Sequence, residues 1–217
     1  MTTQGPDSNI LDAETINWRL IIYPLIAAVV LVLGGLGYYF YQQDQKDLRE
    51  IQAHDATVQA KTPEDLVKIA DQFANTTQSD LARLNAANAF FEKKNYDGAV
   101  KEYQQIVNNS GTAPELRDSA QLGLASILEA TNKIDDALNA YLSVAHRGKE
   151  SPYAPFAYYA AAGIYEERGD KENQRNVLTQ AASLDSDSQF VKQAQAKLKS
   201  LNPTPAAAAP APSPAKP

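Results

Sequence analysis

An uncharged apolar stretch, residues 20–41, constrains this chain more than any other feature. Its twenty-two residues read LIIYPLIAAVVLVLGGLGYYFY. As an α-helix the stretch would be ~33 Å long at ~1.5 Å per residue, close to the ~30 Å hydrocarbon core of a bilayer. Trp18 and Tyr23 mark one end and the aromatic run 38–41 marks the other, as rings at the two headgroup levels do. The sequence therefore predicts a transmembrane helix over residues 18–41.

The flanks of this stretch bear on whether it is an anchor and how it is oriented. A cleaved signal peptide has a basic start and an apolar run of about 7–15 residues, whereas acidic residues prevail in the predicted tail 1–17. Cleavage near Gly35-Leu36-Gly37 is the alternative to an anchor. Lys and Arg are nearly balanced on the two sides, so the positive-inside rule does not give the orientation. An anchor is the favoured interpretation.

Residues 42–60 contain no glycine or proline, and Leu48, Ile51 and Val58 keep helical spacing. We therefore expect a stalk helix that continues the membrane helix. The next segment, Thr62-Pro63-Glu64-Asp65, combines a hydroxyl cap, a proline at the first helical position and acids in the first turn. This combination is a strong helix start.

Three later segments repeat one pattern, in which a helix with small central residues is followed by a polar turn and a second helix. They span residues 79–107, 117–145 and 154–182. Their central residues Ala87, Ala125 and Ala162 are 38 and 37 positions apart. This spacing is near the ~34-residue period of helical repeats with slightly longer loops.

The turns of these segments resemble those of tetratricopeptide repeats. Asn95-Tyr96-Asp97-Gly98-Ala99 is followed by Tyr103, and Lys133-Ile134-Asp135-Asp136-Ala137 is followed by Tyr141. The third segment departs from the pattern with Gln174 where alanine is usual, so we expect its helices to pack less closely. The resemblance implies an all-α fold, with a single N-terminal transmembrane helix followed by a tetratricopeptide-like helical-repeat solenoid over residues 61–201.

The two ends of the repeat region have signals of their own. Ser186-Asp187-Ser188-Gln189 is a capping box before an apolar stripe, which predicts a final helix that covers the open end of the stack. Residues 202–217 then read NPTPAAAAPAPSPAKP, and this composition predicts an extended, disordered tail.

Composition excludes several classes of function. Nineteen basic and twenty-three acidic residues follow residue 41, and this net charge of −4 argues against nucleic acid, which needs a clustered basic face. The absence of cysteine excludes thiol catalysis and zinc–thiolate sites. His54 and His146 are not in a metal-ligand spacing, and no nucleophile or phosphate-binding motif is present. We expect no enzymatic activity, no metal and no cofactor, and no small-molecule substrate.

The tetratricopeptide resemblance also implies a binding groove on the concave surface of the first helices. Carried over to this sequence, its positions are Leu84, Asn85, Asn88, Phe91, Leu122, Ser126, Glu129, Phe156, Tyr159, Gly163 and Glu166. This lining is apolar and amide-rich with acids, which suits an apolar or mildly basic peptide. For Leu84, Leu122 and Phe156, packing against the neighbouring repeat is an equally open alternative.

The whole arrangement, over residues ~18–201, is similar to bacterial inner-membrane proteins of the YfgM type, which are ancillary subunits of the Sec translocon. The strongest local match is Ile69-Ala70-Asp71-Gln72-Phe73 followed by the alanine-rich first repeat. This resemblance implies a single-pass inner-membrane protein with a periplasmic repeat domain. Its implied partners are the translocon, a periplasmic chaperone or secreted clients. The alternative is a scaffold that assembles other envelope proteins, for division, pilus assembly or outer-membrane biogenesis.

Overall fold

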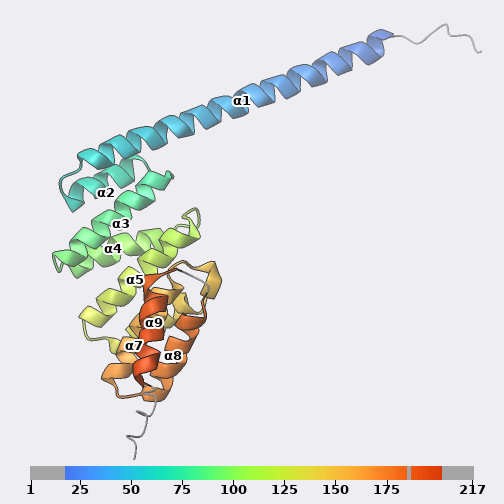
Figure 1. The fold of residues 1–217 in the computed structure, drawn as a ribbon. Helices are drawn as coiled ribbons and strands as arrows, with labels where there is room; N and C mark the ends of the chain where they lie inside the picture. The colour runs from blue at the N-terminus through green and yellow to red at the C-terminus, as the bar shows by residue number, and fades with distance from the viewer. Residues whose placement is uncertain (1–17, 185–186, 202–217) are drawn as a thin grey trace, which may run out of the picture. The chain divides into compact units, whose positions relative to one another are not determined.

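The computed structural model describes residues 18–184 and 187–201, and every regular element in these ranges is helical. The chain divides into two compact units, one ending at Leu48 and the other beginning at Arg49 (Figure 1). The predicted tails 1–17 and 202–217 lie outside the described residues. The all-helical repeat fold expected from the sequence is confirmed.

Helix α1, Trp18–Gln59, begins in the first unit and ends in the second. In the first unit its large apolar side chains are exposed, among them Leu31 at 76%. Within the described residues it is the one helix long and apolar enough to cross a membrane. Pro24 lies inside α1, and membrane helices tolerate this because neighbouring groups satisfy the freed carbonyl.

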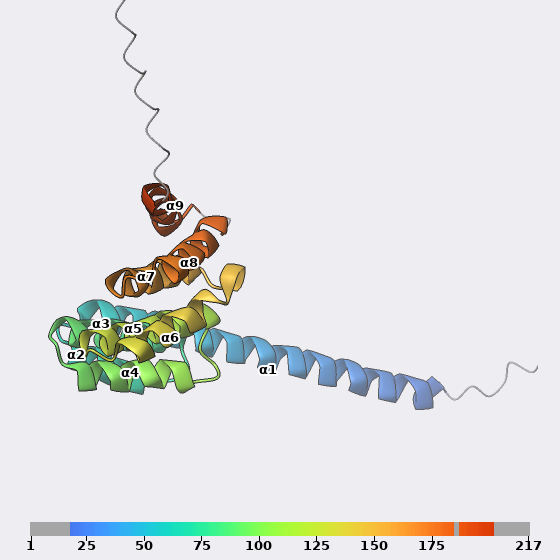
Figure 2. The ribbon, with the colours of Figure 1, turned by 90° about the horizontal axis from the view of Figure 1, so that it is seen from below.

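The second unit contains the remaining helices in chain order. They are α2 (Pro63–Gln72), α3 (Thr77–Glu92), α4 (Tyr96–Asn108), α5 (Pro114–Ala130), α6 (Ile134–Ala145), the 3-10 turn η1 (Gly148–Glu150), α7 (Ala154–Glu167), α8 (Lys171–Ser183) and α9 (Gln189–Leu201). The pairs α3–α4, α5–α6 and α7–α8 are helical hairpins, and each pair packs on the next (Figure 2). Helix α9 follows the last pair; the predicted capping box at its start lies partly outside the described residues.

In all three hairpins the first helix ends in the same way. Lys94, Asn132 and Gly169 occupy equivalent places and all have positive φ, between 58° and 70°. In each turn the amide of this residue donates to the carbonyl three residues earlier, as in Lys94 to Phe91. A left-handed residue at this place ends a helix and satisfies its last carbonyls.

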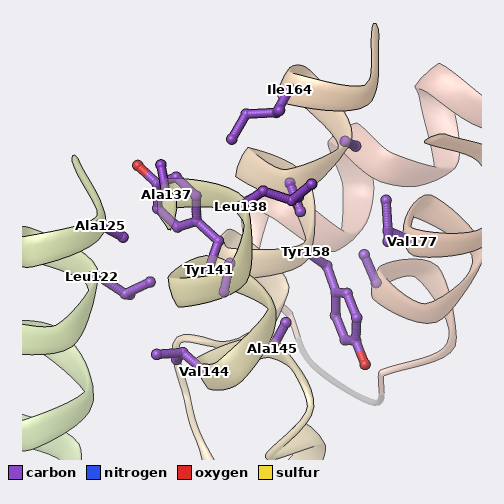
Figure 3. Packing of buried hydrophobic residues seen from close by; sticks show 14 of the residues in the cluster. Leu122, Ala125, Ala137, Leu138, Tyr141, Val144, Ala145, Tyr158, Ile164 and Val177 are labelled. Atoms are coloured by element: carbon purple, nitrogen blue, oxygen red, sulfur yellow. The ribbon is translucent and has the colours of Figure 1, made fainter. Parts of the chain in front are cut away.

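Small residues allow the paired helices to approach. Ala87, Ala125 and Ala162 are fully buried. Ala87 belongs to the first core cluster, formed by α3, α4 and α5. Ala125 and Ala162 belong to the second core cluster, formed by α5 to α9, in which Tyr141 and Leu138 lie between α5 and α7 (Figure 3). Gln174 takes the alanine place in α8 and is buried, with no hydrogen-bond partner for its Nε2. The helices α7 and α8 nevertheless pack as extensively as the other pairs, so the looser packing expected there is wrong.

The last turns of α1 belong to the repeat unit. The Glu50 carboxylate accepts hydrogen bonds from the backbone amides of Thr77, at 2.7 Å, and Gln78, at 3.1 Å, in the first turn of α3. A carboxylate at this place satisfies free amides and complements the positive end of the helix dipole. Ala53 is fully buried, one turn further along α1. The unit boundary therefore lies inside the segment that the sequence predicts as one stalk, residues 42–60.

Candidate peptide-binding surface

The positions predicted for a groove lie on α3, α5 and α7, the first helix of each hairpin. We call these eleven positions the first-helix surface. Asn85, Asn88, Glu129 and Glu166 are exposed there, and most of the others are half-buried. The structure gives several of these side chains partners that the sequence did not reveal.

On α3, Asn88 is tied to the second helix of its own hairpin. The buried Tyr103 reaches from α4 and its hydroxyl donates to Asn88 Oδ1 at 2.5 Å. Burial raises the pKa of Tyr103 to about 12, helped by the nearby charge of Glu92, so the hydroxyl keeps its proton and remains a donor. Asn88 is therefore held by α4 through its Oδ1, although the residue remains exposed.

The second hairpin repeats this arrangement with different acceptors. Tyr141 on α6 donates to Glu129 Oε2 at 2.8 Å, and its oxygen lies 3.1 Å from Ser126 Oγ. The Ser126 hydroxyl also donates to the carbonyl of Leu122 at 3.0 Å. Burial raises the pKa of Tyr141, with a further contribution from Glu129. In the sequence Tyr103 and Tyr141 are recognisable only as the residues that follow two repeat turns. Their 38-residue spacing was the signal that their hydroxyls take equivalent places.

Helix α9 covers much of the third helix of this surface. The Phe190 ring lies 5.0 Å from that of Phe156 and 5.9 Å from that of Tyr159, centroid to centroid. Lys197 lies 5.6 Å above the Tyr159 ring and forms an ion pair with Glu166. These predicted groove residues therefore face α9, as a stacked terminal helix requires.

Of the remaining positions of the first-helix surface, some pack against the core and one faces open space. Leu122 is only 6% exposed and belongs to the core, so the packing alternative holds for it. Leu84 and Phe91 are half-buried against the first core cluster. A Cβ added at Gly163 would meet nothing within 4 Å.

The exposed part of the surface is rich in hydrogen-bonding groups. Asn85 and Asn88 offer amides one turn apart on α3, and Glu129 offers a carboxylate on α5. None of the eleven positions is a lysine or arginine. Within the described ranges no group of three or more His, Cys, Asp or Glu is placed to hold a metal ion. Such a surface suits hydrogen bonding to a peptide backbone.

Comparison with known protein families gives two matches. A family model described as a tetratricopeptide repeat-like domain matches residues 15–148. A second model, described as a tetratricopeptide repeat, matches residues 157–188. A search of curated proteins finds no match.

Proposed function

Because the chain belongs to the tetratricopeptide repeat-like domain family, we propose that it binds segments of other proteins through the first-helix surface while α1 anchors it in a membrane. Repeat proteins of this kind act as platforms for protein–protein interaction. The observation that carries the proposal is the row of exposed amide and carboxylate groups on α3 and α5, held in place by Tyr103 and Tyr141.

The finer assignment rests on the resemblance to ancillary subunits of the Sec translocon. By that resemblance α1 lies in a bacterial inner membrane and the repeat unit in the periplasm. The ligands are then emerging secreted proteins or a periplasmic chaperone that works beside the translocon. The acidic, amide-rich surface supports this in one respect, since it suits apolar or mildly basic polypeptide segments.

Site-specific photo-crosslinking tests the binding surface. A photoreactive amino acid at Asn85 or Glu129 probes the first-helix surface, and the same group at Gln105 or Asn139 probes exposed positions on the second helices α4 and α6. We expect partner adducts at the first two positions and few at the controls. Adducts at Gln105 and Asn139 alone would refute the first-helix surface as the binding site.

The pattern of adducts also separates the two functional classes. An ancillary translocon subunit should cross-link to translocon subunits and to many nascent chains. A scaffold should cross-link to one or a few fixed proteins.

Protease added to spheroplasts checks the topology: a C-terminal tag should be digested and an N-terminal tag spared. The reverse result would contradict a periplasmic repeat unit and the translocon role.

A further inference from the structure

The last turns of α1 carry a second surface feature, outside the first-helix surface. In the described part of the second unit, Ile51 and Val58 are the only large apolar side chains that are exposed, at 58% and 72%. Glu50 holds this part of α1 on the amides of α3, and the burial of Ala53 holds it on the rest of the unit. The two exposed side chains therefore stand on a segment that the repeat unit itself keeps in place.

Ile51 and Val58 lie on one side of α1, together with one acid. At ~100° per residue around a helix, the two are ~20° apart, and Asp55 lies within about 60° of both. Asp55 is exposed as well. The fully buried Ala53 is on the opposite side of the helix. We call Ile51, Asp55 and Val58 the outer face of α1.

Helix α9, which follows the last hairpin, has a different exposed surface. Apart from one alanine its exposed residues are polar, namely Gln189, Lys192, Gln193, Gln195, Ala196, Lys199 and Ser200. A polar outer face is what the terminal element of a repeat array needs to remain soluble. The outer face of α1 is apolar at two of its three positions. Exposed apolar side chains that gather on one side of an element mark an interaction site.

The charge of the outer face selects among the possible occupants. Within the described ranges no cation pairs with Asp55. Arg49 is on the opposite side of α1, Lys61 follows the end of the helix, and His54 flanks the face. Two copies anchored through α1 would pair in parallel and set their Asp55 carboxylates side by side, which is unfavourable. Anionic lipid headgroups would be repelled by the same carboxylate. A partner that brings a positive charge meets neither obstacle.

We propose that the outer face of α1 binds a helix of a partner protein that presents two apolar side chains one heptad apart and a basic side chain between them. The apolar side chains would pack on Ile51 and Val58, as residues seven apart do along the seam of a coiled coil. The basic side chain would pair with Asp55, and the apolar contacts on either side would shield this pair from water. The site is separate from the first-helix surface and does not depend on what that surface binds.

The test uses the full chain in nanodiscs of zwitterionic lipid and labelled, end-capped alanine–glutamine helical peptides, at pH 8, where histidine is ordinarily neutral. One peptide carries two leucines seven residues apart, with lysine four residues after the first. In two controls glutamate replaces the lysine or alanine replaces both leucines. Fluorescence anisotropy, with empty nanodiscs as the blank, should show binding of the first peptide at least tenfold tighter than of either control. No binding up to about 1 mM, or equal binding of all three peptides, would overturn the proposal.

Variants of exposed residues localise the binding without disturbing the core. Asp55→Lys should reverse the preference, so that the lysine peptide binds at least tenfold more weakly and the glutamate peptide more tightly. Replacing Ile51 and Val58 together with serine should weaken the lysine peptide at least tenfold. Asp136→Lys, at an exposed acid on α6, is the matched control and should leave every affinity unchanged. An effect of Asp136→Lys equal to that of Asp55→Lys, or none from either outer-face variant, would refute this location.

A cysteine at position 51 tests the rival occupant, a second copy of the chain. The natural sequence has no cysteine, so Ile51→Cys introduces a single thiol. With two or more copies in one nanodisc and a mild oxidant, we expect no disulfide-linked dimer. Rapid formation of this dimer would show that a second copy covers the outer face, and it would overturn the proposal.

Discussion

Replacing Gly123 with alanine should destabilise the protein, although glycine inside a helix usually costs stability. A Cβ at this position of α5 would lie 2.2 Å from Tyr103 Cζ and 2.6 Å from both ring Cε atoms. Favourable carbon–carbon contacts are at ~3.5–4.0 Å, so the ring would have to move by more than about 1 Å. Tyr103 has little freedom to do so, because it is 3% exposed and hydrogen-bonded to Asn88.

The change in the free energy of unfolding combines one stabilising and two destabilising effects of the new methyl group. Alanine in a helix interior is favoured over glycine by about 1 kcal/mol. Overpacking a well-filled core costs ~1–3 kcal/mol, and disturbing the Tyr103–Asn88 hydrogen bond costs a further ~0.5–1.5 kcal/mol. The net expectation is a loss of roughly 0.5–3.5 kcal/mol for Gly123→Ala. Gly163, inside α7, has nothing within 4 Å of an added Cβ, so Gly163→Ala should gain about 0.5–1 kcal/mol from helix propensity alone.

Thermal melts of the full chain, followed by circular dichroism in the same detergent, compare the two variants directly. Gly123→Ala should melt below the wild type and Gly163→Ala above it. A double-mutant cycle with Tyr103→Leu identifies the cause, because the alanine at 123 should cost much less once the ring is gone. Shifts of the same sign for the two alanines, or a Gly123→Ala penalty that persists in the Tyr103→Leu background, would refute the reasoning.

Three further predictions concern packing and pH. Ala87→Leu should cost ~1–3 kcal/mol because Ala87 is fully buried between two helices, whereas Ala113→Leu, at an exposed place, should lie within ~0.5 kcal/mol of neutral in the same melts. Hydrogen bonds from the Asn173 side chain and amide hold the pKa of Asp170 below its usual value. The stability that the Asp170 carboxylate contributes is therefore present above pH ~4 and is lost as the pH falls through the lowered pKa. In melts from neutral to acid pH, Asp170→Asn should lose less melting temperature than the wild type. Burial raises the pKa of Tyr103 to about 12. The stability that its protonated hydroxyl contributes is therefore present below pH ~10 and is lost as the pH rises through about 12. Tyr103→Phe should lose less melting temperature at alkaline pH than the wild type, and an equal loss in both proteins would contradict this.

Local signals in the sequence were enough to predict the helices and the repeat. Thr62 caps α2 by accepting from the amide of Asp65 at 3.1 Å, with Pro63 in the first turn, as its residue types predict. Asn95 caps α4 in the same way through the amide of Gly98. Caps and helical periodicity depend on residues within one or two turns of each other, so a single sequence contains them. The apolar length of α1 is also a local property, and it predicts a span by composition alone.

The tertiary structure alone decided which predicted surface residues remain open. Tyr103 reaches Asn88 across 15 positions of sequence and needs Gly123, from the next hairpin, for room. Lys197 pairs with Glu166 across 31 positions, when α9 packs over α7. Periodicity gives the face of a helix on which a side chain lies, but what covers that face depends on the shapes of segments distant in sequence.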